Sequence, residues 1–133
     1  MYRLCFVLFF GLAVCWNIGC SPAPKGAAPA TGVKGTVNID GKPIPTGEIA
    51  FGMPGVPSKY IAIKDGSFAG DAPIGKNQVE IFIYKDGPPL STDPGKPTKI
   101  NTTLPKYHGP TTTLDATVNA TGTNEFKFDI TSK

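Results

Sequence analysis

The sequence has little of the chemistry that enzymes and nucleic-acid-binding proteins usually need. Arginine occurs once, as Arg3, histidine once, as His108, and tryptophan once, as Trp16. Arginine is the preferred side chain for bidentate contacts with phosphate and guanine, and the twelve lysines are dispersed along the chain. We therefore expect no binding to nucleic acid. A hydrolase needs a nucleophile, a base and an orienting group, so we also expect no catalytic residues and no enzymatic activity.

Metal ligands are equally sparse. A zinc site needs clustered histidine or cysteine, and the chain has no such cluster. The aspartates are scattered and stand beside turn residues, where aspartate commonly stabilises the turn itself, whereas calcium needs several convergent oxygens. We expect neither a metal nor a cofactor.

Cysteine is confined to the first twenty residues, at Cys5, Cys15 and Cys20. Cys5 and Cys15 lie inside the only long apolar run, which extends from Leu4 to Trp16 after a short basic start. A basic start, an apolar middle and a small residue at a candidate cleavage site are typical of a secretory signal. The run is shorter than the roughly 17–25 residues of a membrane-spanning helix. If it is removed, no internal disulfide can form.

The end of this run resembles the lipobox of bacterial lipoproteins, because Gly19 directly precedes Cys20, although Asn17 stands where that motif usually has leucine. The resemblance implies that residues 1–19 are a signal peptide, that the Cys20 thiol receives a diacylglycerol, and that the new N-terminus is acylated. Each buried methylene of such an anchor contributes about 0.8 kcal/mol, and more than one chain makes attachment stable. The expected location is the bacterial cell envelope, anchored to a membrane by lipid, with the domain facing the periplasm or the exterior. A non-lipid signal cut slightly later and an uncleaved anchor reaching Ile18 are the alternatives.

The remaining chain divides into a tether and one domain. Residues 20–32 are rich in proline, alanine and glycine and predict an extended tether. From residue 33 to residue 133, short apolar alternations are separated by proline and glycine, the pattern of an all-β domain. No segment of this range has a helical period. We expect seven strands forming an antiparallel β-sandwich, at residues 33–39, 48–51, 60–64, 67–69, 77–84, 114–118 and 125–130.

One stretch of the domain, residues 86–113, is long, polar and poor in strand pattern. Long loops in compact domains are uncommon and are often functional or disordered. It is therefore expected to be either a recognition loop on a rigid scaffold or a loosely packed excursion. Alternation with the apolar residues places three aromatic side chains on outward faces, and a fourth lies in the loop. These four are the candidate contacts for a ligand or partner: Tyr60, Phe82, Tyr84 and Tyr107.

The domain also resembles the carboxypeptidase regulatory-like domains found in small bacterial lipoproteins. The resemblance rests on Gly35-Thr36-Val37-x-Ile39-Asp40-Gly41-Lys42-Pro43-Ile44-Pro45, on Asp65-Gly66-Ser67-Phe68 followed by Ala72-Pro73-Ile74-Gly75, and on the ending Asn124-Glu125-Phe126-Lys127-Phe128. It implies a transthyretin-like (prealbumin-like) sandwich and no catalysis. The expected function is that of a non-enzymatic, lipid-anchored envelope protein whose sandwich binds or braces another envelope component, either an envelope protein or a glycan. The alternative is an envelope module for a small ligand or glycan that uses the outward aromatics or the 86–113 loop.

Overall fold

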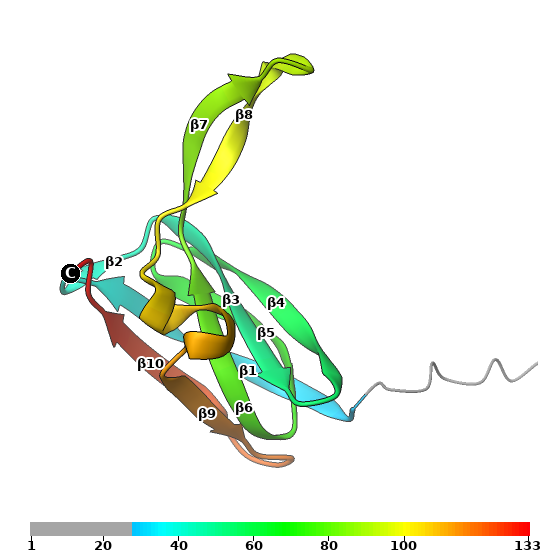
Figure 1. Ribbon diagram of the computed structural model, residues 1–133. Helices are drawn as coiled ribbons and strands as arrows, with labels where there is room; N and C mark the ends of the chain where they lie inside the picture. Colours follow the sequence, from blue (N-terminus) through cyan, green and yellow to red (C-terminus); the bar gives the residue numbers. More distant parts are fainter. Residues whose placement is uncertain (1–27) are drawn as a thin grey trace, which may run out of the picture.

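The computed structural model describes residues 28–133, which form strands and two short 3-10 helices (Figure 1). The expected signal peptide, Cys20 and most of the tether lie outside the described residues. Within residues 28–133 no helix is long and apolar enough to span a membrane. The strands are β1 (Ala30–Ile39), β2 (Lys42–Pro43), β3 (Thr46–Met53), β4 (Val56–Lys64), β5 (Ser67–Pro73), β6 (Gly75–Phe82), β7 (Tyr84–Leu90), β8 (Asp93–Asn101), β9 (Leu114–Val118) and β10 (Glu125–Ile130), and the 3-10 helices are η1 (Pro105–Tyr107) and η2 (Gly109–Thr111).

The prediction of an all-β domain is confirmed. One large sheet has the order β10-β1-β5-β4-β3-β6-β9, with β2 paired to β1, and β7 and β8 form a separate two-stranded sheet. Every pair is antiparallel except β1 with β10, which is parallel. Asp65 and Gly66 have φ values of 49° and 75° and make the tight turn between β4 and β5. Asp-Gly favours such a turn because both positions need a positive φ.

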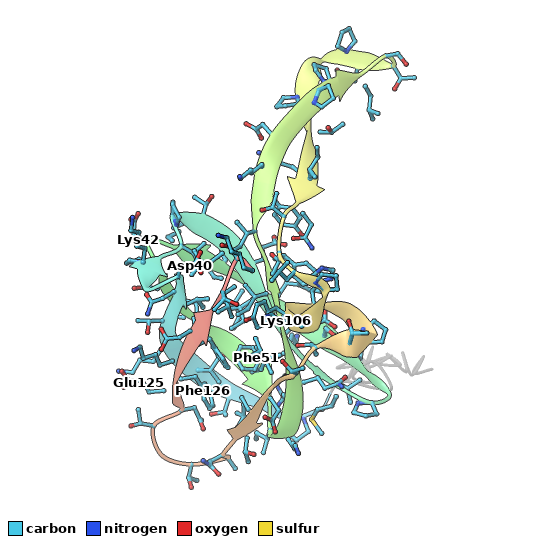
Figure 2. All side chains as sticks on the ribbon, turned by 60° about the vertical axis from the view of Figure 1, so that its left-hand side comes forward. Asp40, Lys42, Phe51, Lys106, Glu125 and Phe126 are labelled. Carbon is cyan, nitrogen blue, oxygen red and sulfur yellow. The ribbon has the colours of Figure 1, made fainter. Side chains whose placement is uncertain are left out.

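The large sheet curls around a single apolar core. Phe51 of β3 lies 6.0 Å, between ring centroids, from Phe68 of β5 and from Phe126 of β10, although these strands are separated in the sheet order. Phe128 completes the group at 6.4 Å from Phe68 and 6.2 Å from Phe126. Figure 2 shows Phe51 and Phe126 within the body. The four phenylalanines therefore join strands that hydrogen bonding alone leaves far apart.

Gly35 makes this aromatic contact sterically feasible. It lies on β1 between its partners Phe68 of β5 and Phe126 of β10. A Cβ at this position would lie 2.0 Å from the carbonyl oxygen of Phe126 and 2.8 Å from the ring of Phe68. The missing side chain lets β10 and the Phe68 ring approach β1 closely.

The β1–β10 pair carries an exposed polar contact on its outer face. The side-chain amide of Asn38 donates to Asp129 Oδ1 at 2.7 Å, and Lys127 Nζ lies 3.1 Å from Asp129 Oδ2. The hydrogen bond from Asn38, followed by the interactions with Lys127, lowers the pKa of Asp129 below its ordinary value of 3.8. The ionised carboxylate is therefore preferred more strongly in the folded chain than in the unfolded chain.

Asp129→Asn is expected to flatten part of the acid dependence of stability. Because the folded-state pKa is lowered, the contribution of Asp129 is present above about pH 4 and is lost as the pH falls through the folded-state value. Urea unfolding midpoints measured at steps from about pH 5 to pH 2 would show a shallower fall for the variant than for the native chain. Asp71→Asn, an exposed position on β5, is the control. Equal slopes for the native chain and Asp129→Asn would contradict the prediction.

The structure differs from the sequence expectation at residues 86–113. Their first half belongs to β7 and β8, a hairpin that projects from the body and is called the hairpin below (Figure 1). Leu90 and Ile100 of the hairpin are 59% and 49% exposed, so they do not anchor it to the core. The cross-strand pair Asp86–Lys99 forms an ion pair instead.

The strand pattern of the hairpin was not recognisable in the sequence, because neither face of the hairpin is buried and its strands contain Pro88, Pro89, Pro94 and Pro97. Proline is tolerated there because both hairpin strands are edge strands.

The second half of this stretch returns to the body and is fixed to it by hydrogen bonds. The Thr103 hydroxyl accepts from the Ile83 backbone N–H at 2.8 Å, and the Thr112 hydroxyl donates to the Val79 carbonyl at 2.6 Å. Tyr107 is buried, and its hydroxyl lies 3.0 Å from the Thr131 hydroxyl. The return segment is therefore part of the folded body, and the hairpin alone stands clear of it.

Candidate functional site

Three of the sequence-predicted candidate residues come together on the outer face of the sheet. The ring centroids of Tyr60 on β4 and Phe82 on β6 are 6.1 Å apart, and those of Phe82 and Tyr84 are 6.3 Å apart with nearly parallel planes. His108 adds a fourth ring, 5.8 Å from Phe82. Tyr60, Phe82, Tyr84 and His108 are called the aromatic cluster below. Tyr60 is 61% exposed, whereas the other three are half-buried.

The aromatic cluster depends on a small residue in the strand between its two main rings. Ala50 of β3 pairs with Tyr60 on one side and with Glu80 on the other. It is 1% exposed, because its outward methyl group lies beneath its larger neighbours. A side chain this small allows rings from β4 and β6 to meet across β3. The cluster is thus built across β3, which pairs with β4 on one side and with β6 on the other.

A shallow recess adjoins the aromatic cluster where the hairpin leaves the body. Its volume is about 570 Å³, and it is lined by Thr46, Gly47 and Glu48 of β3 together with Tyr84 and Lys99 of the hairpin. These five residues are called the root recess. A Cβ on Gly47 would lie 2.6 Å from the Phe82 carbonyl oxygen, so glycine permits the close approach of β6. The root recess combines a carboxylate, an ammonium group and two hydroxyl groups.

Tyr84 connects the root recess with the aromatic cluster. Its hydroxyl donates to Glu48 Oε2 over 3.4 Å. Partial burial, and then the nearby Glu48 carboxylate, raise the pKa of Tyr84 above its ordinary value of 10.0. The tyrosine therefore keeps its proton at neutral pH and acts as a hydrogen-bond donor toward Glu48 or toward a bound molecule.

His108 and Tyr107, which are neighbours in sequence, have different surroundings. His108 Nε2 lies 3.1 Å from the Thr103 carbonyl oxygen, which can only accept, so this nitrogen carries the hydrogen. Tyr107 is only 8% exposed, and Lys106 Nζ lies 5.0 Å from its ring centroid. The structure therefore does not bring Tyr107 to the surface with the other three candidates. It packs in the core, where its hydroxyl binds the Thr131 side chain and accepts from the Thr131 N–H at 3.1 Å.

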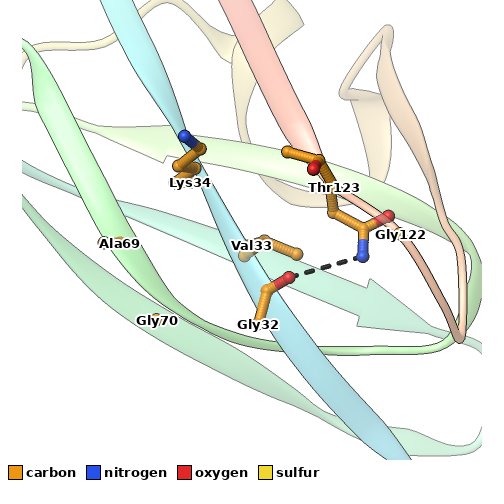
Figure 3. A pocket seen from close by; sticks show the side chains of 8 residues that line it. Gly32, Val33, Lys34, Ala69, Gly70, Gly122 and Thr123 are labelled. Carbon is orange, nitrogen blue, oxygen red and sulfur yellow. Dashed lines mark hydrogen bonds between the residues drawn. The ribbon is translucent and has the colours of Figure 1, made fainter.

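A second hollow, of about 500 Å³, lies beside the N-terminal half of β1, between β1, β5 and the segment before β10 (Figure 3). Its walls are mostly glycine, alanine and backbone, and Lys34 is the charged side chain among them. The Asn124 side-chain amide crosses it to the Gly32 carbonyl at 3.3 Å (Figure 3). Asn124 also accepts from the Asn119 N–H at 2.8 Å, so its amide holds loop and strand together. This hollow lacks the convergent polar and aromatic groups of the root recess.

Sequence reasoning did not identify several residues of the site. Glu48, Lys99 and His108 join Tyr60, Phe82 and Tyr84 only because β3, β6 and the hairpin root meet in space. The alternation of β3 does place Glu48 on the outward face. For Lys99 no local signal exists, because its strand carries no apolar pattern. In residues 28–133 no group of three histidine, cysteine, aspartate or glutamate side chains is placed to hold a metal ion.

Comparison with known proteins gives no relative from which a role can be transferred. No family model, curated protein or solved structure matches the chain significantly. The function is therefore inferred from the arrangement of the residues described above.

Proposed function

We propose that this chain is a non-enzymatic, lipid-anchored protein of the bacterial cell envelope whose all-β body binds or braces another envelope component. The observation that carries the proposal is that the point of chain entry and the hairpin lie at opposite ends of the body. Ala30, where β1 begins, pairs with Pro73 beside the start of β6, whereas the hairpin follows the far end of β6. Eight residues of β6 span roughly 26 Å at 3.3 Å per residue. The hairpin thus lies far from the point of chain entry (Figure 1), and Phe82, the last residue of β6, lies at the hairpin end.

An anchored binding module requires this separation between the point of chain entry and the binding surface. With lipid on Cys20, an extended tether of residues 21–29, which ends where β1 begins at Ala30, would hold the body as much as about 28 Å from the bilayer. The chain enters the body at the end nearest the tether, so the hairpin and the root recess are directed away from that bilayer. Exposed recognition elements on a rigid scaffold are the usual arrangement for binding proteins. The contact partner is therefore a component beyond the anchoring membrane surface.

We infer a transthyretin-like sandwich similar to carboxypeptidase regulatory-like domains, carrying the hairpin as an addition. In support, the main path of the large sheet contains seven strands, and Phe51 packs against Phe68 and Phe126 from the facing part of the sheet. A non-catalytic role is supported by His108, whose Nε2 is engaged by a backbone carbonyl.

Metabolic labelling with a clickable fatty acid tests the anchor. The native chain, expressed in a bacterium that processes lipoproteins, is expected to carry label and to sediment with membranes, because a diacylglycerol on Cys20 holds it there. Cys20→Ser is expected to lose the label and to appear in the soluble fraction. An unlabelled native protein, or one that keeps its first nineteen residues by intact mass, would refute the lipid anchor.

A further inference from the structure

We propose that the aromatic cluster and the root recess together form a binding site for an uncharged glycan chain, with a pyranose ring stacked on Tyr60 and Phe82 and its neighbour in the root recess. The inference rests on the proposed non-catalytic binding role and names the ligand class of the surface that the body presents away from its anchor. It does not depend on the lipid itself.

The chemistry of the surface matches a pyranose in two respects. A pyranose ring has an apolar face of C–H groups, which carry partial positive charge, and aromatic ring faces are negative. Tyr60 supplies the exposed ring, at 61% accessibility, and Phe82 supports it at a centroid distance of 6.1 Å. The rim of a pyranose consists of hydroxyl groups, which both donate and accept hydrogen bonds. An aromatic platform bordered by mixed polar groups satisfies both requirements.

The root recess provides those polar groups in one place. The carboxylate of Glu48 only accepts hydrogen bonds, the ammonium group of Lys99 only donates, and the hydroxyls of Thr46 and Tyr84 do both. The proton that Tyr84 retains at neutral pH makes its hydroxyl available as a donor. Lys99 is paired with Asp86, so the Glu48 carboxylate leaves the recess with a net negative charge, which disfavours an anionic ligand. A volume of about 570 Å³ lies within the range of about 300–1,000 Å³ typical of small-ligand pockets.

The same features argue against a protein as the occupant. A stable protein interface covers about 800 Å² on each partner and has an apolar centre from which charged residues are depleted. Here the centre is small, because Tyr60 is the only large hydrophobic residue of the body, among residues 28–133, that is strongly exposed. Glu48 and Glu80 lie directly beside the rings as strand neighbours of Phe82 and Ala50. Flanking carboxylates suit hydroxyl groups better than they suit an apolar protein surface.

The arrangement also predicts the minimum length of the ligand. The root recess and the Tyr60–Phe82 platform share Tyr84, which lines the recess and stacks on Phe82 at 6.3 Å. One sugar ring cannot fill the recess and cover Tyr60 at once, since Tyr60 is not among the residues that line the recess. We therefore expect oligosaccharides to bind more tightly than the corresponding monosaccharide.

Calorimetric titration with cellohexaose and with chitohexaose, two uncharged oligosaccharides of β-1,4-linked pyranoses, tests the site on the full processed chain. At least one of the two is expected to bind saturably, with dissociation constants near the millimolar end of the affinity scale, and more tightly than glucose or N-acetylglucosamine. Tyr60→Ala is expected to weaken binding at least about tenfold, equivalent to about 1.4 kcal/mol. Leu90→Ala removes a comparably exposed apolar side chain from the hairpin tip and is expected to leave the affinity unchanged.

Two further measurements keep the outcomes distinct. Circular dichroism of Tyr60→Ala is expected to match the native chain, because an exposed ring contributes little to folding, and Glu48→Gln provides an independent reduction of affinity if Tyr60→Ala fails to fold. Absence of saturable binding by both oligosaccharides, or a protein partner that is lost on Tyr60→Ala while no oligosaccharide binds, overturns the glycan proposal and leaves the lipid anchor standing. Oligosaccharide binding by a chain whose Cys20 is never acylated supports the glycan site and removes only the anchor.

Discussion

Replacing Gly35 by alanine is expected to destabilise the domain by at least about 3 kcal/mol, at or beyond the upper end of usual overpacking effects. The new Cβ would lie 2.0 Å from the Phe126 carbonyl oxygen. A backbone oxygen paired into a sheet cannot rotate away as a side chain can, so β10 must separate from β1 and the Phe68 ring must shift. Both movements disrupt the contact of Phe51 with Phe68 and Phe126. Chemical unfolding followed by far-ultraviolet circular dichroism measures the free energy of unfolding directly.

Gly32→Ala is the matched control for this prediction. Gly32 lies on the same strand and also pairs with β5, opposite Asp71, but nothing lies within 4 Å of its ideal Cβ. The control is expected to change stability by less than about 0.5 kcal/mol, or to raise it slightly by restricting the unfolded chain. If the two variants unfold with the same free energy, the close approach of β10 to β1 at Gly35 is wrong.

Phe51→Ala is expected to cost about 3–5 kcal/mol, the range observed for truncation of a fully buried phenylalanine. Phe51 is 0% exposed and contacts aromatic residues from two other strands. Its removal therefore leaves a cavity between parts of the sheet that hydrogen bonds do not join. In a domain with a total stability of about 5–15 kcal/mol, the loss is a large share of the whole.

Equilibrium unfolding in urea measures this effect, with Leu90→Ala as the control. Leu90 is 59% exposed at the hairpin tip, so its truncation is expected to remain within about 0.5 kcal/mol of the native value. A loss below about 1.5 kcal/mol for Phe51→Ala would indicate that the two parts of the sheet do not pack through this ring.

Local sequence patterns predicted the strands whose one face is buried. The alternations ending in Val118 and in Ile130 give strands at Leu114–Val118 and Glu125–Ile130, as expected, and Asp65-Gly66 forms the expected turn. The same alternation predicts the outward side of Tyr60 and Phe82. These features depend on near neighbours in sequence, where burial on one face imposes a period of two.

Features that depend on distant contacts could not be predicted in this way. The hairpin has no buried face, so Ile100 and its neighbours show no alternation against which its register could be recognised. The parallel pairing of β10 with β1 leaves no local trace, and neither does the position of Lys99 beside Glu48. Tyr107 was predicted as a contact residue of the 86–113 loop, yet it is buried and its hydroxyl binds Thr131 beyond β10.

The parallel pairing of β1 with β10 has a consequence for the order in which the domain forms. Asn38 and Asp129, which meet across this pair, are 91 residues apart in sequence. Contacts at such separations form late, since the intervening chain must first lose entropy. One edge of β1, and the space beside Gly35, remain open until β10 arrives. The large sheet therefore stays incomplete until residues 125–130 have been made and have paired with β1.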